Sequence, residues 1–410
     1  FLIGTGWFSL QKLPIDAVPD ITNVQVQVLT AAPSLAPLEV ERQITFPIEI
    51  AMSGLPGVSQ VRSVSKFGLS AVTIVFNDSV DTYFARQLVL ERLSTVRQQI
   101  PETIGSPEMG PISTGLGEIY QYEIRPASGG VRDPIALRTI QDWIVRRQLM
   151  GTSGVAEVNS YGGQKKQYHV KVDPAKLQAY GLTMRDVLNA VIANNANVGG
   201  AYIEHSGEQY VLRGIGLAQT TNQIANIIVK TGKEGVPIFI RDVATVAIGS
   251  EVRQGAVVAD GKGEIVAGIV MMLKGENSRT VVERAKERVA QLRKSLPPGI
   301  EVVPFYDRAE LVDRTIHTVE ANLFEGAILV IVVLLVVLGN WRGALLVASV
   351  IPLSMLFAAI CMNAFKVSGN LMSLGAIDFG LIVDGAVVMV ENAVRRLAEA
   401  QHERLSEDRK

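Results

Sequence analysis

Three acidic residues lie within one strongly apolar stretch near the end of the sequence. They are Asp378, Asp384 and Glu391, and the surrounding apolar run covers residues 370–394. An ionised carboxylate at the centre of a membrane costs about 3 kcal/mol or more, so such residues are rare there and carry function. Carboxyl groups in a low-dielectric site can take up and release protons near neutral pH. We therefore predict a proton relay.

The spacing of these acids constrains how a helix presents them. Asp384 and Glu391 are seven residues apart, so they share one face of a helix to within about 20°. Asp378 is offset from Asp384 by about 120° in an ideal helix. Two alternatives remain: the acids can be structural groups that bond to neighbouring helices, and Glu391 can lie at the membrane surface.

Several apolar segments approach the length of about 20 residues that a membrane-spanning helix needs. We predict membrane helices at residues 323–340, 343–367 and 370–397, and a cytoplasmic tail at 398–410. Residues 1–12 are interpreted as the outer end of a first membrane helix whose start is missing. The alternatives are a pair of buried core helices and, for residues 1–12, a short buried or interfacial segment.

Basic residues next to the apolar runs predict the orientation. Arg342 follows the first long run, and Arg395 and Arg396 follow the third. Short cytoplasmic loops are enriched in such residues, so these turns belong inside the cell and the large polar region outside. In a bacterium the chain would lie in the inner membrane with a large periplasmic region.

The polar region alternates between strand and helix patterns. Residues 24–30 and 57–76 predict three strands, and residues 38–52 and 81–100 predict two helices, the second with an N-cap at Asp81. The order is β-α-β-β-α, and one more strand would complete a ferredoxin-like (split βαβ) unit. We therefore expect an α+β fold.

The pattern then recurs about 100 residues later. Residues 57–63 (GVSQVRS) resemble residues 154–160 (GVAEVNS), and the similar element order suggests an internal duplication. The elements expected in the second copy are strands at 119–124, 155–160 and 167–172, and helices at 133–150 and 174–193. A Gly-rich region at 197–255 reads as an inserted subdomain, followed by a buried strand, a helix and a final strand at 265–273, 278–296 and 300–304.

The composition excludes several functions. The 39 basic and 40 acidic residues give a formal net charge of −1, which argues against nucleic-acid binding. Cys361 is the single cysteine, so neither a disulfide nor a cysteine cluster can form within the chain. The four histidines are widely separated. No nucleophile–base pair or phosphate-binding loop is present, so we expect neither an enzyme nor a bound cofactor.

The sequence resembles a known family. Residues 370–392 contain D-F-G-x-x-x-D-G-A-x-x-x-x-E-N, which is similar to the fourth membrane helix of resistance-nodulation-division (RND) pumps, in particular the cobalt-zinc-cadmium type of the heavy-metal efflux branch. Residues 13–21, 137–150 and 306–314 agree with this. The copper-silver type generally lacks the acid equivalent to Asp378, so the resemblance favours divalent substrates.

The resemblance implies an architecture and partners. The chain would be the N-terminal half of a homotrimeric pump, surrounded by membrane lipid, that works with a periplasmic adaptor and an outer-membrane channel. Residues 20–113 would form the first porter subdomain, residues 114–165 with 256–308 the second, and residues 166–255 an inserted docking subdomain. Protons entering through the acidic helix would drive export of zinc, cobalt or cadmium as the transported substrate.

Candidate metal ligands are few. Glu118 and Glu123 begin the second porter unit, where the resemblance implies residues facing the transport cleft, and carboxylates suit zinc and cobalt. Their odd spacing places them on opposite faces of an ideal strand. We select Glu118, with a solvated glutamate at the strand edge as the alternative. Met271 and Met272 are expected to fill a core.

Two further functions are compatible with the sequence. An RND pump for organic compounds would keep the proton relay but line its cleft with aromatic and apolar residues, and aromatic residues make up only 6% of the chain. A non-transporting membrane receptor with the same fold would leave the three acids dispensable.

Overall fold

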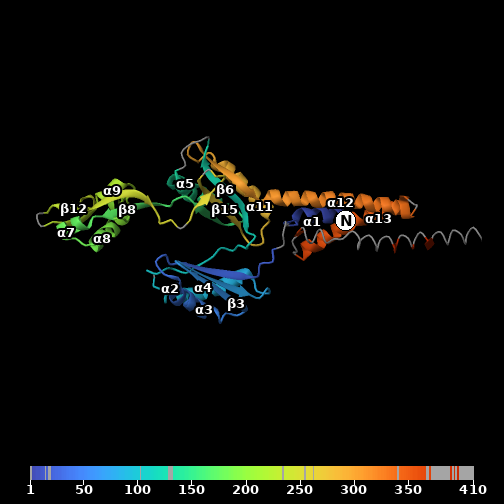
Figure 1. Cartoon of the computed structure of the whole chain (residues 1–410), viewed down its shortest axis with the longest axis horizontal. Helices are drawn as coiled ribbons and strands as arrows, with labels where there is room; N and C mark the ends of the chain where they lie inside the picture. Colours follow the sequence, from blue (N-terminus) through green and yellow to red (C-terminus); the bar gives the residue numbers. More distant parts are fainter. Residues whose placement is uncertain are drawn as a thin grey trace, which may run out of the picture.

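A computed structural model gives the architecture of the chain (Figure 1). It describes residues 2–13, 15–16, 20–101, 103–127, 133–232, 235–253, 255–261, 263–338, 341–365, 369–370, 388–389, 392 and 395–396. The described part is elongated. An insertion lies at one end, long helices extend toward the other, and two α+β units lie between them (Figure 1).

The first unit is a four-stranded antiparallel sheet with helices packed against it. Its sheet order is β3-β4-β2-β5. The strands are β2 (Gln25–Ala31), β3 (Val58–Lys66), β4 (Leu69–Phe76) and β5 (Glu108–Met109). The helical segments are α2 (Pro37–Val40), η1 (Glu41–Thr45), α3 (Phe46–Met52) and α4 (Thr82–Arg97).

Local sequence explains these elements. Alternate residues of β2 are buried, as its pattern of apolar residues predicts. Asp81 caps α4 as expected, because its Oδ1 accepts hydrogen bonds from the backbone N–H groups of Tyr83 and Phe84 at 2.9 and 3.0 Å. One core combines the buried faces of the sheet and of all the helical segments.

The second unit repeats this topology, with its strands drawn from two distant parts of the chain. Its sheet order is β7-β15-β6-β16, so both sheets order their four strands as second, third, first and fourth. The short strand β14 (Val257–Val258) also pairs with β15. The elements are β6 (Glu118–Pro126), α5 (Pro134–Ile140), η2 (Gln141–Val145), α6 (Arg146–Met150), β7 (Val155–Gly162), β15 (Glu264–Met272), α11 (Ser278–Leu292) and β16 (Ile300–Asp307).

The duplication extends to irregular features. The first helix of each unit contains a π-helical turn, η1 in the first unit and η2 in the second. The following strand is preceded in each unit by a glycine with positive φ, at +78° for Gly57 and +90° for Gly154. This left-handed conformation is accessible to glycine at little cost. The sequence echo at these glycines therefore reflects a shared backbone path.

One expectation from the local pattern is wrong. The strand expected at residues 167–172 exists as β8 (Lys166–Val172), but it pairs with β13 (Ala244–Ser250) outside the second unit. The third strand of the second unit is β15, about 100 residues later along the chain. Alternation of residues identifies a strand but carries no information on its partner.

The helix expected at 174–193 is divided into α7 (Pro174–Tyr180) and α8 (Met184–Asn194). Gly181 ends α7 in the left-handed conformation, with φ at +58°. Thr183 then begins α8 through a capping box with Asp186. A left-handed glycine followed by a capping box stops one helix and starts another.

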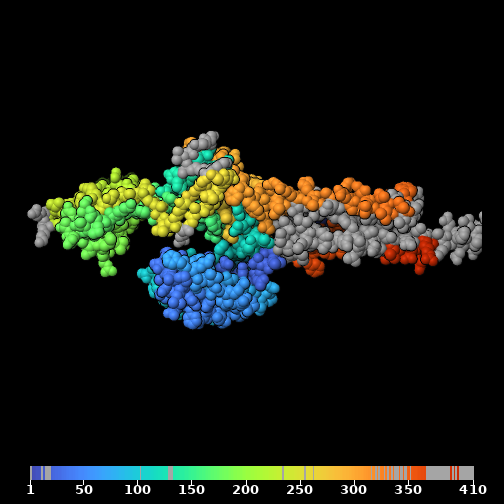
Figure 2. Space-filling model, viewed as in Figure 1, coloured from blue at the N-terminus to red at the C-terminus, as the bar shows by residue number. Residues whose placement is uncertain are grey.

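β8, β13 and the segment between them form a separate lobe, which we call the insertion (Figure 2, green to yellow). It has small cores of its own, centred on Ile240 and Val243. Its remaining elements are β9 (Val198–His205), β10 (Glu208–Gly214), α9 (Thr221–Ala225), β11 (Ile228–Thr231), β12 (Pro237–Phe239) and α10 (Ile240–Val243). β9 and β10 form an antiparallel hairpin in which every residue is exposed.

The long helices form the opposite end of the molecule. They are α1 (Leu2–Lys12), α12 (Arg308–Leu338) and α13 (Trp341–Ala364). β1 (Ile15–Asp16) pairs with β17 (Gly369–Asn370), and Gly6 of α1 lies directly against Leu356 of α13. Within the described residues, no helix combines the length and the apolar character needed to cross a membrane.

Candidate functional site

The predicted proton relay lies in a part of the chain that the structure does not describe. Asp378, Asp384 and Glu391 all fall outside the described residues. Their role therefore stays a prediction from the sequence. The described residues contain the other predicted site residue, Glu118, and the connection from the second unit toward the apolar segments.

Glu118 lies at the start of β6, in a row of three residues across the second sheet. It is exposed and accepts a hydrogen bond from Gln121 Nε2 at 3.2 Å. Its partner in register on β15 is Met271, which in turn is in register with Glu157 on β7. Neighbouring strands are about 4.8 Å apart, so the two glutamates flank Met271 with Cα atoms about 10 Å apart.

Sequence reasoning missed Glu157, because its place beside Met271 depends on pairing between distant strands. Glu157 also contacts Arg146 at 3.9 Å. The odd spacing of Glu118 and Glu123 predicted that they lie on opposite faces of an ideal strand. The pairing of β6 with β15 shifts register between Val270 and Met271, close to Glu118, so strict alternation does not apply to these two residues. Glu123 is buried. Among the described residues, no group of three or more His, Cys, Asp or Glu side chains is arranged to hold a metal ion.

The two methionines of β15 differ in environment. Met272 is buried in the core of the second unit, as expected. Met271 is only partly buried, and its Sδ atom accepts a hydrogen bond from Asn159 Nδ2 at 3.2 Å. Met271 therefore lies in register between Glu118 and Glu157, and it is not part of the buried core that contains Met272.

A buried polar chain ties the π-helical turn η2 to the second sheet. The Tyr122 hydroxyl donates to Gln141 Oε1 at 3.0 Å, and Gln141 Nε2 donates to Ser160 Oγ at 3.1 Å. Burial raises the pKa of Tyr122 far above its usual range. Burial, supported by the charge of Asp307, raises the pKa of Tyr120 to about 12. Both phenols therefore stay protonated at neutral pH.

The first unit uses a similar device at its own π-helical turn. Thr45 ends η1 and lies 2.8 Å from both Ser65 Oγ and Ser70 Oγ, measured from its Oγ1 atom. Buried polar groups are costly unless they are hydrogen-bonded. The two networks therefore hold each π-helical turn in a defined position against its sheet.

The second unit continues directly into the longest helix. β16 ends at Asp307 and α12 begins at Arg308, with no residue between them. The buried Arg308 donates from Nη1 to the carbonyl oxygen of Leu116 at 2.9 Å. Two ion pairs join α11 to this region, Arg279 with Asp313 at 3.3 Å and Lys286 with Asp307. A displacement of α12 would therefore be transmitted to the second unit.

The two units are also joined by a lysine. Lys274 follows β15, and its Nζ donates to the backbone carbonyl oxygens of Thr22 and Asn23 at 3.1 and 3.3 Å. Ser113, in the segment between the units, donates from Oγ to the carbonyl oxygen of Met272 at 3.0 Å. The second unit thus contacts the first unit, the insertion and α12.

Comparison with known proteins assigns this arrangement to a family. The AcrB/AcrD/AcrF family matches residues 1–410. The chain is 54% identical over 406 residues to the cation efflux system protein CzcA of Alcaligenes sp. (strain CT14), an alignment that covers 98% of this chain and 38% of that protein. The cobalt-zinc-cadmium resistance protein CzcA of Cupriavidus metallidurans matches with the same identity and coverage.

A solved structure supports the same assignment. The crystal structure of a heavy metal efflux pump superposes with a TM-score of 0.87 at 39% sequence identity, and covers 96% of this chain and 39% of that chain. The fold is therefore that of the RND pumps, which confirms the resemblance found in the sequence. The chain belongs to the AcrB/AcrD/AcrF family. It spans 38% of the length of the CzcA proteins that it matches.

Proposed function

We propose that this chain is part of a proton-driven pump that exports divalent heavy-metal cations of the zinc, cobalt and cadmium class. The observation that carries the proposal is the 54% identity with a cobalt-zinc-cadmium resistance protein over 98% of the chain. The identity is lower, at 40%, with the cation efflux system protein CusA of Escherichia coli. The protein would act as a secondary transporter, with the metal ion as its substrate.

The two α+β units would be ferredoxin-like porter subdomains. Residues 20–113 would form the first, and residues 114–165 with 256–308 the second. Their common strand order supports this division, because an antiparallel sheet built from a β-α-β-β-α-β order is the split βαβ unit. Residues 166–255 would form the docking subdomain, which is supported by the separate small cores of the insertion.

Proton uptake would be coupled to metal transport through α12. In this proposal Asp378, Asp384 and Glu391 relay protons along a membrane helix at residues 370–397, and residues 323–340 and 343–367 form two further spans. Residues 1–12 would belong to another. The uninterrupted passage from β16 into α12 supports this coupling, because a continuous helix transmits displacement without a flexible loop.

Glu118 would contribute to the binding of the metal in the porter cleft, together with Glu157 and Met271. Carboxylates are ligands for zinc and cobalt, and a thioether suits softer ions such as cadmium. Support comes from the register that places both glutamates beside Met271. Further ligands would come from protein beyond this chain.

The partners proposed for the pump are two identical subunits, a periplasmic adaptor and an outer-membrane channel. The hairpin of β9 and β10 supports contact between copies, because its strands expose apolar residues that include Tyr202, Ile203 and Val211. Exposed apolar patches of this kind mark interaction surfaces. The pump would be located in the bacterial inner membrane.

The test is Asp384→Asn in the full-length protein. We expect loss of zinc, cobalt and cadmium resistance in cells, with unchanged expression and assembly. The reason is that an amide, unlike a carboxylate, does not take up and release a proton near neutral pH. Asp78→Asn, an exposed position in the first unit, is the matched control and should retain resistance. Unchanged metal resistance in Asp384→Asn would refute the relay. Resistance only to organic compounds in cells with the native protein would refute the metal assignment.

A further inference from the structure

A groove lies where the second unit meets the insertion. Two adjoining hollows of about 470 and 480 Å³ share Arg138 of α5 and Lys165, which precedes β8. This size falls within the range of ligand-binding pockets, about 300–1,000 Å³. The groove lies at the point where the chain leaves the second sheet and returns to it.

The walls of the groove are strongly basic. One hollow contains five cations and a single carboxylate, Asp142, and the other adds Arg253 and Glu251. The groove therefore carries six cations and two carboxylates, and two of the cations are paired with carboxylates outside its lining, Arg146 with Glu157 at 3.9 Å and Arg253 with Glu264 at 2.5 Å. The six cations are Arg138, Arg146, Arg147, Lys165, Lys166 and Arg253.

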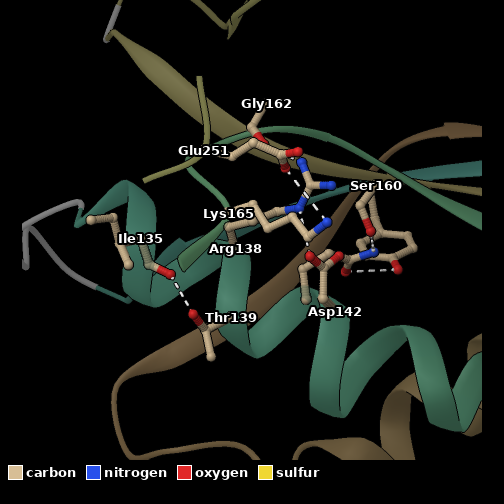
Figure 3. A network of polar contacts seen from close by, with 10 residues as sticks. Ile135, Arg138, Thr139, Asp142, Ser160, Gly162, Lys165 and Glu251 are labelled. Atoms are coloured by element: carbon tan, nitrogen blue, oxygen red, sulfur yellow. Dashed lines mark hydrogen bonds and ion pairs between the residues drawn. The ribbon is translucent and has the colours of Figure 1, made fainter. Parts of the chain in front are cut away.

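Some of these charges are used to build the groove (Figure 3). Arg138 donates from Nε to Asp142 Oδ2 at 2.9 Å and from Nη1 to the carbonyl oxygen of Gly162 at 2.7 Å. Lys165 contacts Glu251 at 3.5 Å. These contacts hold α5 against the two chain segments that lead into the insertion, so the base of the groove is preformed.

Two other cations rest on aromatic rings. The Arg147 guanidinium lies 4.1 Å from the ring centre of Trp143, and Lys166 Nζ lies 5.3 Å from that of Tyr168. Neither forms an ion pair with another residue in the described part of the chain. Trp143 is 61% exposed. Cation–π contacts orient these side chains without neutralising their charge.

This combination indicates what the groove binds. Exposed tryptophan and arginine are typical of the residues that dominate protein–protein binding. The cations come from α5–α6, from residues 165–166 and from Arg253, so they are spread along both hollows. A site for a single phosphate would instead need cations that converge on one point. Met150 adds an apolar contact beside Trp143. A chain with several carboxylates and aliphatic groups matches both features.

We propose that this groove binds an acidic polypeptide segment of a partner protein. Carboxylates of the segment would pair with Arg147 and Lys166, and its aliphatic groups would pack on Trp143. The proposal concerns assembly and does not depend on the ion that is transported. Because the charges are solvent-exposed, binding should weaken as the ionic strength rises above about 0.1 M, where the Debye length is about 10 Å.

The experiment measures binding of a defined acidic peptide to the purified full-length protein. The probe is a fluorescein-labelled octapeptide of alternating Glu and Leu. Its binding is measured by fluorescence anisotropy. In the variant Arg147→Glu/Lys166→Glu the Kd should rise at least about tenfold, because both cations are replaced by like charges. Lys176→Glu/Arg185→Glu, which makes the same charge change at exposed positions of α7 and α8, should leave the Kd within about twofold.

A second variant separates the groove from general electrostatics. Trp143→Ala keeps every charge and should still weaken binding by about fivefold, because the aromatic anchor is lost. Equal binding by all variants would overturn the proposal. Vesicles of phosphatidylglycerol and inorganic phosphate are tested in parallel. Groove-dependent binding of either, without binding of the peptide, would also overturn the assignment to a polypeptide.

Discussion

The two α+β units share one topology but differ in what they connect. Both have the same strand order, a π-helical turn in the first helix and a left-handed glycine before the second strand. The first unit is continuous in sequence from β2 to β5. The second unit is divided by the insertion, continues into α12, and contacts the start of the first unit through Lys274. The two units therefore have similar folds, but only the second connects the insertion, α12 and the other unit.

The way in which the insertion is attached to the second sheet gives this difference a physical basis. In the second unit the insertion follows β7 and the chain returns through β15, so both ends of the insertion start from neighbouring strands. Two closely spaced attachment points restrict rotation of a lobe more than one does.

The largest predicted effect concerns the centre of the second sheet. A Cβ atom on Gly268 would lie 2.2 Å from Cζ of Tyr122, so Gly268→Val should destabilise the second unit by about 4 kcal/mol or more. We expect loss of folded protein, measured by thermal unfolding and yield. Gly54→Ala in the first unit is the control, since its Cβ would meet no atom within 4 Å. A stable Gly268→Val protein would contradict the tight packing.

A smaller effect compares the two polar networks. Gln141→Leu leaves the buried Tyr122 hydroxyl without its partner and should cost about 2 kcal/mol, whereas Thr45→Val should cost about 1–2 kcal/mol in the first unit. Chemical unfolding of both variants measures the difference. If Gln141→Leu proves neutral while Thr45→Val destabilises, the two π-helical turns are not equivalent devices.

The smallest expected effect on stability concerns the contact between α11 and α12, which has no counterpart in the first unit. Asp313→Arg places a like charge opposite Arg279, at a pair that is 3.3 Å apart in the native protein. Exposed pairs contribute about 0.2–1 kcal/mol, so stability should change little. Metal resistance should fall if α12 transmits motion, and Arg279→Asp/Asp313→Arg should restore part of it.

Glu283→Gln is the control for this pair. It removes the other ion pair of Arg279, which lies within α11, and leaves the contact with α12 in place. Resistance should therefore be retained. Full resistance in Asp313→Arg would show that this contact is not needed for coupling.

Much of the fold could be predicted from the sequence. The periodicity of apolar residues predicted β2, α4 and the last three elements of the second unit, and Asp81 was identified as an N-cap. The repeated motif that begins at Gly57 and Gly154 pointed to the duplication. These features depend on dihedral preferences and on contacts between residues close in sequence, which a short segment already expresses.

The candidate site was less accessible from the sequence. The role of Asp378, Asp384 and Glu391 is predicted from residue type, apolar surroundings and the family resemblance, and it stays a prediction. Glu118 was selected by type and position, but the neighbouring Glu157 was not. No local signal relates these two glutamates, since 38 residues separate them along the chain and a third strand lies between them in the sheet.

The sequence by itself therefore determined most of the strands and helices of the two units, the glycines that begin the repeated motif, and which segment carries acids among apolar residues. Only the tertiary structure decided that β8 pairs with β13, that β15 completes the second sheet, and that Met271 lies between Glu118 and Glu157. The physical reason is the range of the interactions. Helix and strand patterns express short-range preferences, whereas strand pairing depends on which distant apolar surfaces are buried together.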